Sequence, residues 1–222
     1  MVSIHTISLR LANVYLIEDS SGMFLVDAGM PGDERHILRY MDFLGRNDLK
    51  LIFITHAHID HYGSAAAMKC ITGAPIAIHG ADAQAMANGE TRLGEVRGRG
   101  RVIKWFLPMI ETYFRAAAVQ ADLLMQDGDD LNAYGMAAEI VKTPGHTPGS
   151  SSLWVENRHV FVGDLLSTKG RPHAQRYYAS DWSQIPDSLR RIQALQAEKI
   201  YPGHGRQPMD SVTLKVICTG AG

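Results

Sequence analysis

Apolar and polar positions alternate with a period near two over residues 3–27, and the polar stretch Asp19–Gly22 interrupts the alternation. Because successive side chains of a strand point to opposite faces, this pattern predicts strands joined by a hairpin turn. The nearly continuous apolar run Leu49–Ile54 is typical of a buried strand. Between these two stretches, residues 31–44 predict a helix that opens with proline.

Helix and strand patterns keep alternating along the rest of the chain. The alanine-rich stretch Gly63–Cys70 and the run 185–196 favour helices. Short runs of β-prone apolar residues predict strands at 75–78, 139–141, 152–155, 159–162 and 199–201. With no internal repeat and no low-complexity linker, the sequence predicts a mixed α/β fold in one domain that covers residues 1–222.

Residues 92–124 depart from this alternation and are predicted to form an irregular helical excursion. Basic residues gather at its start, and Trp105, Phe106 and Met109 follow. Pro108 should break or kink a single helix here, because proline lacks the amide N–H that a helix interior needs. The pattern favours a segment that packs its aromatic residues on the core and keeps a solvated basic face. A substrate lid and a membrane or partner surface are the alternatives.

Composition and charge place the chain among ordinary globular proteins. Of its 222 residues, 45% are hydrophobic and 20% charged, and the formal net charge of -1 gives no reason to expect a nucleic-acid partner. No window approaches the ~20 consecutive apolar residues of a membrane span. Cys70 and Cys218 match no metal-binding spacing, and the N-terminal segment lacks the pattern of a secretory signal, so we expect a cytoplasmic protein.

The strongest chemical signal directly follows the expected buried strand. The run Thr55–His61 contains His56, His58, Asp60 and His61, which are all possible metal ligands. In extended chain, side chains two residues apart point the same way, so His56 and His58 can converge on one ion. Asp60 and His61 come where the chain turns into the alanine-rich helix, and they can face a second position beside the first. An aspartate at such a boundary could instead cap the helix.

Three further residues occupy comparable places in the sequence. His146 lies in a loop with two prolines and two glycines, Asp164 follows the apolar run 159–162, and His204 lies in a glycine-bearing loop after the last short strand. Each has an ordinary explanation, as a turn residue for Asp164 and as hydrogen-bonding loop residues for the histidines. All three nevertheless share one arrangement, a possible ligand just beyond the carboxyl end of a strand, where functional sites gather.

These motifs, with the aspartate of the early run Leu25–Gly29, follow one another in the order found in the metallo-β-lactamase-fold superfamily of metallohydrolases, which the sequence resembles over nearly its whole length. The resemblance implies a four-layer αββα sandwich of two mixed β-sheets, with the metal site at one edge. It also implies that Asp27 supports the ligand loop from outside the metal shell. The implied ligands are His56, His58 and His146 for a first metal, Asp60, His61 and His204 for a second, and Asp164 as the bridge.

The expected cofactors are two divalent metal ions, with zinc first and iron or manganese as alternatives. Their charge outweighs that of two carboxylates and a bridging hydroxide, so the site would favour anionic groups. Zinc lowers the pKa of a bound water to about 7, so we expect the bridging hydroxide to be the nucleophile. Asp60 is the expected catalytic residue, because it could orient that hydroxide and pass its proton to the leaving group.

Departures from known branches narrow the function that the resemblance implies. True class B β-lactamases usually carry Cys or Ser where this chain has Asp164, and the thioester-binding helical tail of glyoxalase II follows the last histidine, where only residues 205–222 remain. These departures argue against antibiotic hydrolysis and against the glutathione thioester as substrate. Within the superfamily we expect a glyoxalase II-like or lactonase-like hydrolase of a small ester-like substrate, a thioester or a lactone. A mononuclear iron persulfide dioxygenase and a phosphodiesterase are the alternative enzymes, and a non-catalytic metal-binding module comes last.

Aromatic residues after Asp164 are expected near the substrate, which should be a small molecule. Tyr177, Tyr178 and Trp182 fall in a region that commonly forms a pocket wall in this family, and a tyrosine hydroxyl there could donate to a developing oxyanion. Ordinary packing is the alternative for all three residues. No motif in the sequence specifies the substrate or the oligomeric state.

Overall fold

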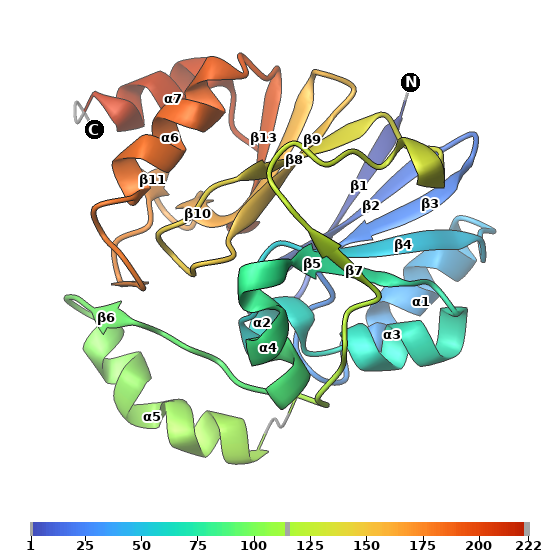
Figure 1. Cartoon of the computed structure of the whole chain (residues 1–222), viewed down its shortest axis with the longest axis horizontal. Helices are drawn as coiled ribbons and strands as arrows, with labels where there is room; N and C mark the ends of the chain where they lie inside the picture. Colours follow the sequence, from blue (N-terminus) through green and yellow to red (C-terminus); the bar gives the residue numbers. More distant parts are fainter. Residues whose placement is uncertain (1, 114–115, 220–222) are drawn as a thin grey trace.

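The first sheet is built mainly from the N-terminal half of the chain. The computed structural model describes residues 2–113 and 116–219 (Figure 1). Six strands form this sheet in the order β1-β2-β3-β4-β5-β7. Pairing is antiparallel from β1 to β3 and parallel from β3 onwards, so the sheet is mixed. The strands are β1 (Ser3–Ser8), β2 (Asn13–Asp19), β3 (Gly22–Val26), β4 (Leu49–Ile54), β5 (Ile76–His79) and β7 (Leu123–Met125).

The second sheet comes from the C-terminal half. Its strands follow the order β11-β10-β9-β8, and β13 pairs with β10 in parallel, so this sheet is mixed as well. A separate two-stranded ribbon joins β6 (Glu95–Val96) to β12 (Tyr178–Ala179). The strands of the second sheet are β8 (Ala138–Lys142), β9 (Ser151–Val155), β10 (His159–Ser167), β11 (His173–Ala174) and β13 (Lys199–His204).

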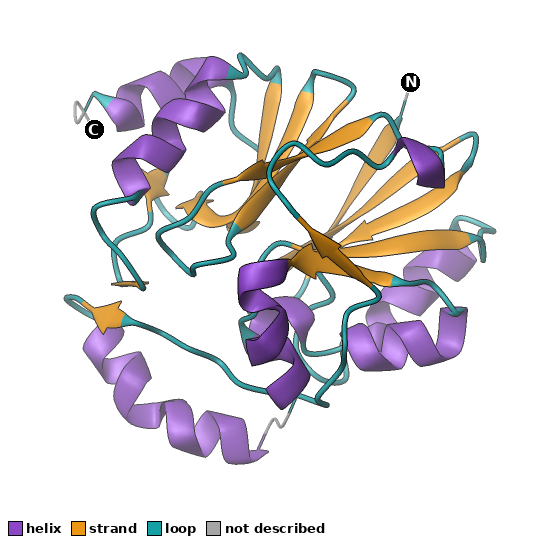
Figure 2. Ribbon diagram, in the orientation of Figure 1, coloured by secondary structure: helices purple, strands orange, loops and turns teal. Residues whose placement is uncertain are grey.

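Helices cover the outer face of each sheet (Figure 2). The expected four-layer αββα arrangement of two mixed sheets is therefore confirmed. A short 3-10 turn, Asn132–Tyr134, precedes β8. The helices on the first sheet are α1 (Glu34–Phe43), α2 (Ile59–Tyr62), α3 (Ala65–Thr72) and α4 (Gly80–Asn88), and those on the second are α6 (Ile185–Ala194) and α7 (Ser211–Cys218).

Alternation along the strands divides their side chains between a central core and two outer cores. In β3, Leu25 packs with the helices outside the first sheet, while its neighbour Phe24 faces the second sheet. In β10, Phe161 joins the central core and Val162 packs with α6 and α7. Because successive strand residues point to opposite faces, a strand buried on both faces must be apolar throughout. These buried strands hold the segments that carry the candidate site.

Residues 92–124 contain one long helix, α5 (Gly100–Tyr113), which starts from the β6–β12 ribbon and not from either sheet (Figure 1). The helix continues through Pro108, so the break that the sequence suggested there does not occur. Proline removes the hydrogen bond that its own N–H would donate, but the turns on both sides remain helical. Residues 114 and 115 of this segment lie outside the described residues.

Three large apolar residues of α5 do not pack on the core. Trp105, Phe106 and Met109 are all exposed, so the expectation that they cover the core is wrong. The reason is the position of α5, which lies outside the helix layers of both sheets (Figure 2). Within the described residues, no helix has the length and apolar character that crossing a bilayer requires.

Candidate metal centre

β4 delivers the histidine-rich segment to one edge of the first sheet. His56 follows β4 closely, and His58 keeps an extended backbone with φ -107° and ψ 146°. The ring centroids of His56 and His58 lie 4.7 Å apart, as their spacing in extended chain predicts. α2 begins at Ile59, so Asp60 lies inside its first turn and His58 is the capping residue. The alternative that Asp60 serves as the helix cap is therefore wrong.

His146 lies in the loop between β8 and β9. Gly145 in this loop has a φ of 128°, a conformation that favours glycine, and a Cβ atom there would lie 2.7 Å from the Cδ1 atom of Ile185. The Thr147 amide donates to Ser150 Oγ at 3.0 Å and closes the loop on the other side. The glycine and this polar turn together define the path of the loop that presents His146.

Asp164 and His204 belong to strands and not to the loops that the sequence suggested. β10 continues past Gly163 to Ser167, and β13 extends as far as His204. Pairing between these parallel strands shifts register on both sides of Gly163, whose φ is 49°. An irregularity of this kind re-aims side chains without ending a strand. Asp164 is buried within β10, so its alternative interpretation as a turn residue is wrong.

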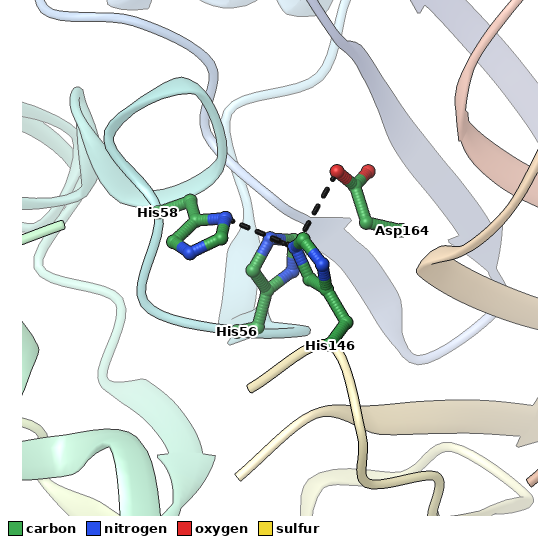
Figure 3. Close-up of side chains that lie close together, drawn as sticks. All are labelled: His56, His58, His146 and Asp164. Carbon is green, nitrogen blue, oxygen red and sulfur yellow. Dashed lines mark hydrogen bonds and ion pairs between the residues drawn. The ribbon is translucent and has the colours of Figure 1, made fainter. Parts of the chain in front are cut away.

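Four buried side chains converge and are called the four-residue group: His56, His58, His146 and Asp164 (Figure 3). One ligand atom from each lies within 4.8 Å of all the others. His146 Nε2 is 3.1 Å from His56 Nε2 and 3.0 Å from His58 Nδ1. Asp164 Oδ2 lies 3.5 Å from the same His146 nitrogen. The three imidazoles thus direct nitrogen atoms at one small volume beside a carboxylate.

Asp60, His61 and His204 form the three-residue group beside it. Asp60 Oδ2 lies 3.6 Å from His204 Nε2 and 3.9 Å from His61 Nε2. Asp164 lies between the two groups, because its Oδ1 atom is 3.2 Å from His61 Nε2 and 3.1 Å from His204 Nε2. The structure therefore brings all seven residues singled out in the sequence into one cluster, with Asp164 shared.

Each of the five histidines directs one ring nitrogen at an outer partner and the other into the cluster. Metal-binding histidines typically hold their second nitrogen in this way, because the outer hydrogen bond fixes the tautomer and the ring orientation. An ordinary hydrogen-bonding role explains only the outer half of each ring. The outer contacts are His56 Nδ1 to Thr55 Oγ1 at 3.0 Å, His58 Nε2 to Arg92 O at 3.1 Å, His61 Nδ1 to Asp27 Oδ2 at 2.7 Å, His146 Nδ1 to Tyr178 O at 3.1 Å and His204 Nδ1 to Leu11 O at 2.7 Å.

A family model described as the metallo-beta-lactamase superfamily matches residues 7–204, a range that contains all seven residues. The chain belongs to this superfamily. It is 25% identical to the probable metallo-hydrolase YflN of Bacillus subtilis (strain 168), over 91% of this chain and 83% of YflN. It is 28% identical to the acyl-coenzyme A thioesterase MBLAC2 of Homo sapiens, over 87% of this chain and 72% of MBLAC2. Membership of this superfamily makes the chain a metallo-hydrolase-type enzyme.

Solved structures support the same assignment of the fold. The structure of TTHA1623 in a di-iron-bound form matches with a TM-score of 0.73 and 23% identity, over 97% of this chain and 98% of that chain. At this identity the likeness carries the fold alone. The metallo-beta-lactamase fold expected from the order of the motifs is therefore confirmed by both the family model and the structural match.

The cluster fits the metal ions that metallo-beta-lactamase superfamily members bind. His56 and His146 each direct Nδ1 at an outer acceptor, which leaves lone pairs on two Nε2 atoms only 3.1 Å apart, an arrangement that a shared cation would stabilise. The buried His61 Nε2 and Asp164 Oδ1 atoms lie 3.2 Å apart, yet neither forms a well-directed hydrogen bond within the described residues. A bound cation would satisfy both atoms. Imidazole and carboxylate donors together suit zinc as well as iron.

Electrostatics differ between the two groups. Burial lowers the pKa of His146 to about 3, so its ring is neutral at neutral pH, the state that metal coordination requires. Burial also opposes protonation of His204, but the Asp164 carboxylate outweighs it and raises the pKa of His204 to about 9. Burial would raise the pKa of Asp164, yet His204 and His61 hold it well below its usual range. In the metal-free protein, protons therefore partly balance the carboxylate charge that metal ions would balance.

Asp27 supports the cluster from outside, as the superfamily resemblance implied. It is buried at the end of β3 and accepts a hydrogen bond from the Thr55 amide at 2.8 Å and from the Thr55 hydroxyl at 2.9 Å. Its Oδ2 atom also lies 2.7 Å from His61 Nδ1. One carboxylate thus orients a ring of the three-residue group and, through Thr55, the segment that carries His56.

Asp82 is a second buried outer carboxylate, and sequence reasoning missed it. It lies in the first turn of α4 and accepts hydrogen bonds from the Ala57 amide at 2.9 Å, the Thr147 hydroxyl at 2.7 Å and the Gly149 amide at 2.7 Å. These bonds join the loop of the first two histidines to the loop of His146. No motif surrounds Asp82 in the sequence, so only the fold reveals this role.

The cluster opens onto a pocket of about 430 Å³. Tyr177 and Tyr178 line it, as expected from their place after Asp164, whereas Trp182 does not and lies instead under the Arg97 guanidinium, 4.4 Å from its ring centroid. Most of the other wall is apolar, and two cations add positive charge. The lining includes the apolar Leu11, Met30, Ile59, Leu93 and Leu166, the cations Lys169 and Arg176, and the cluster residues His58, Asp60, Asp164 and His204.

Proposed function

We propose that this protein is a binuclear metal-dependent hydrolase of small ester-like substrates, with thioesters and lactones as the preferred classes. The observation that carries the proposal is the arrangement of seven ligand-type side chains in two groups that share Asp164 and open onto an apolar pocket. In this proposal the four-residue group holds one ion and the three-residue group the other. The expected single-domain organisation and cytoplasmic location stay predictions.

Two divalent ions held by these residues would supply Lewis acidity and a hydroxide nucleophile at neutral pH. Asp60 is suited to handle the proton of that reaction, because it lines the pocket and is only partly buried. We propose that Asp60 orients the nucleophile and delivers a proton to the leaving group, as a positioned carboxylate can. Tyr178, whose ring also lines the pocket, can donate its hydroxyl hydrogen to the substrate oxygen that becomes negative.

The pocket supports an acyl substrate with a charged carrier. Leu11, Met30 and Leu166 offer an apolar wall for an acyl group, and Lys169 and Arg176 line the same pocket where an anionic leaving group would find its counter-charge. The name of the 28% identical human relative, acyl-coenzyme A thioesterase MBLAC2, fits this chemistry. We therefore place acyl thioesters of anionic thiols first among the ester-like substrates.

Metal content and turnover measured on one preparation test the proposal. Protein purified without added metal is expected to contain two zinc ions per chain and to hydrolyse acyl thioesters faster than matched oxygen esters. One iron per chain, with oxygen consumption on a persulfide substrate, would overturn it in favour of a dioxygenase. Metal-loaded protein that turns over no thioester, lactone, ester or phosphodiester would overturn the enzymatic proposal altogether.

Histidine variants test which group of residues holds each metal ion. His61→Ala should lower the metal content toward one ion per chain, because it removes a nitrogen from the three-residue group alone. His36→Ala is the matched control, since this α1 histidine has an exposed side chain and lies outside both groups. The control should keep two ions and full turnover.

A further inference from the structure

One face of α5 carries an apolar stripe that the described part of the chain leaves exposed. Val102, Trp105, Phe106 and Met109 have exposed fractions of 58%, 82%, 46% and 54%. Their spacing of three, one and three residues places all four on one side of a helix. These residues are called the α5 stripe. Isolated exposed apolar residues are ordinary, but four that share one helix face indicate an interaction surface.

Three exposed cations lie near the stripe in the sequence and have no acidic partner among the described residues. Arg99, Arg101 and Lys104 are exposed, and none of them forms an ion pair within the described part of the chain. Arg97, by contrast, pairs with Glu95. The sequence contains no Asp or Glu from Val96 to Ile110, although the chain as a whole has a net charge of -1. Positive charge is therefore concentrated at this helix, and it complements an anionic surface.

The composition of the stripe favours a lipid surface over a second copy of the chain. Two copies docked through this face would bring six cations together, with Glu111 of each α5 as the one acidic residue that this helix sequence supplies to balance them. A bilayer with anionic headgroups supplies the missing charge and needs no complementary groove. Trp105, the most exposed of the four, is of the residue type that gathers at membrane–water boundaries.

The length of α5 fits a helix that lies on a bilayer. Its 14 residues extend about 21 Å, short of the ~30 Å hydrocarbon core, and the cations lie just before the helix and in its first five residues. A helix of this kind buries its apolar face at the boundary between headgroups and acyl chains. The proposed contact has an apolar part and a charged part. The stripe would enter the boundary of the acyl chains, and the cations would remain beside the lipid phosphates.

α5 is attached to the wall of the metal pocket. The Arg97 amide, three residues before the helix, donates to the Tyr177 carbonyl at 2.7 Å, and β6 pairs with the strand that carries Tyr178. Both tyrosines line the pocket. The segment that leads into α5 is therefore hydrogen-bonded to the residues that line the substrate pocket.

We propose that α5 docks this protein on the surface of an anionic lipid bilayer, with the α5 stripe inserted at the acyl boundary and Arg99, Arg101 and Lys104 against the headgroups. The proposal stands on the exposure and charge of α5 and does not depend on the proposed hydrolase activity. Loss of turnover by a metal-site variant such as His61→Ala would leave vesicle binding unchanged, so failures of the two proposals are distinguishable.

Co-sedimentation of the full chain with vesicles tests the docking. The protein should bind vesicles of phosphatidylcholine with about one third phosphatidylserine, bind pure phosphatidylcholine at least tenfold more weakly, and be released by high salt. Binding should also shift tryptophan fluorescence to shorter wavelength, and Trp105→Phe should remove most of that shift while binding persists. Equal binding to neutral and anionic vesicles would contradict the role of the cations.

Two sets of variants with matched controls assign the contact to α5. The double variant Trp105→Ser with Phe106→Ser should weaken vesicle binding at least tenfold, whereas Phe43→Ser, on α1 and 81% exposed, should not. Arg101→Gln with Lys104→Gln should weaken binding about 25-fold, at about fivefold per cation. Arg35→Gln, an exposed α1 cation, is the control for charge.

The oligomeric state distinguishes a lipid surface from a second copy. All these side chains are exposed, so each variant should keep the thermal midpoint of the parent protein. If the parent binds no vesicles and forms a dimer that Trp105→Ser converts to monomer, a second copy covers the stripe and the lipid proposal is wrong. A monomer that binds neither kind of vesicle would overturn it equally.

Discussion

The Asp82 carboxylate accepts a hydrogen bond from the Thr147 hydroxyl at 2.7 Å, although 65 positions separate the two residues in the sequence. The same oxygen accepts from the Ala57 amide at 2.9 Å, and the second oxygen accepts from the Gly149 amide at 2.7 Å. Ala57 lies between two histidines of the four-residue group, and Thr147 follows the third. Hydrogen bonds to a buried charge are strong, so this one carboxylate sets the distance between the two histidine loops.

Asp82→Asn should loosen the metal site. An asparagine side chain accepts through only one of its two terminal atoms, so at least one loop N–H loses its partner. We expect metal affinity to fall about 10- to 100-fold, the usual effect of losing an outer partner of the ligands. The free energy of unfolding should fall by about 2 kcal/mol. Competition with a chromophoric chelator measures the affinity, and urea unfolding of the metal-free protein measures the stability.

Asp122→Asn is the control for Asp82→Asn. Asp122 also accepts a hydrogen bond from a backbone amide, that of Ile76 at 2.8 Å, and pairs with Lys69, but these contacts involve none of the seven cluster residues. This variant should lose stability without losing metal affinity. If Asp82→Asn binds metal as tightly as the parent, Asp82 does not position the histidine loops.

Asp27→Asn should act on the three-residue group first. Asp27 contacts His61 Nδ1 at 2.7 Å, and asparagine tolerates the φ of 60° that this position requires. The neutral amide removes the charge that stabilises and orients the His61 ring. Metal analysis after dialysis against a weak chelator should show a fall from two ions toward one per chain. Equal loss of both ions would contradict a separate role for the three-residue group.

Features that depend on local sequence could be predicted well. The apolar run Leu49–Ile54 forms β4 with the same bounds, because burial on both faces needs only a short continuous apolar stretch. The close approach of His56 and His58 follows from the geometry of extended chain, and the helix turn after them brings Asp60 and His61 to the next position. Ligands at such short spacing need no knowledge of the rest of the fold.

Features that depend on distant partners could not be predicted. β10 continues through Asp164 because β13, much later in the chain, pairs with it across the register shift at Gly163. Asp82 becomes an outer partner only when the His146 loop folds over it. The amphipathic pattern of α5 shows that one face is apolar, but the pattern does not say what covers that face, and its stripe is exposed.

Asp60→Asn should separate proton transfer from folding. Asparagine keeps the shape of the side chain and one oxygen, but it cannot accept and deliver the proton of the proposed reaction. We expect kcat on an acyl thioester to fall about 10²- to 10⁴-fold, with the thermal midpoint close to that of the parent, because Asp60 is only partly buried. Near-parent turnover with both ions bound would refute the catalytic role of Asp60.

Gly203→Ala should disturb the cluster by steric contact alone. A Cβ atom at Gly203 would lie 2.6 Å from His61 Cε1 and 2.7 Å from Asp164 Oδ1, so two of the proposed ligands would have to move. We expect at least a tenfold loss of metal affinity, measured by chelator competition. Gly80→Ala is the control, since its nearest contact would be the flexible Gln126 side chain at 3.3 Å. This α4 substitution should stabilise the protein by about 0.5–1 kcal/mol and leave metal affinity unchanged.

Tyr178→Phe should lower turnover without changing metal content. The Tyr178 ring lies 6.1 Å from the His58 ring and 5.6 Å from the His146 ring, between centroids, and it lines the pocket. Burial, with the nearby Asp164, raises the pKa of its hydroxyl above the ordinary value of 10.0, so this group is a hydrogen-bond donor at neutral pH. Phenylalanine keeps the ring and the carbonyl that accepts from His146, and removes only the donor. We expect kcat to fall about 10²-fold with little change in KM, because a donor to a developing oxyanion acts mainly in the transition state. Tyr177 lines the same pocket, so Tyr177→Phe is the control. An equal loss of kcat in both variants would indicate altered packing of the pocket wall instead of a lost hydrogen-bond donor.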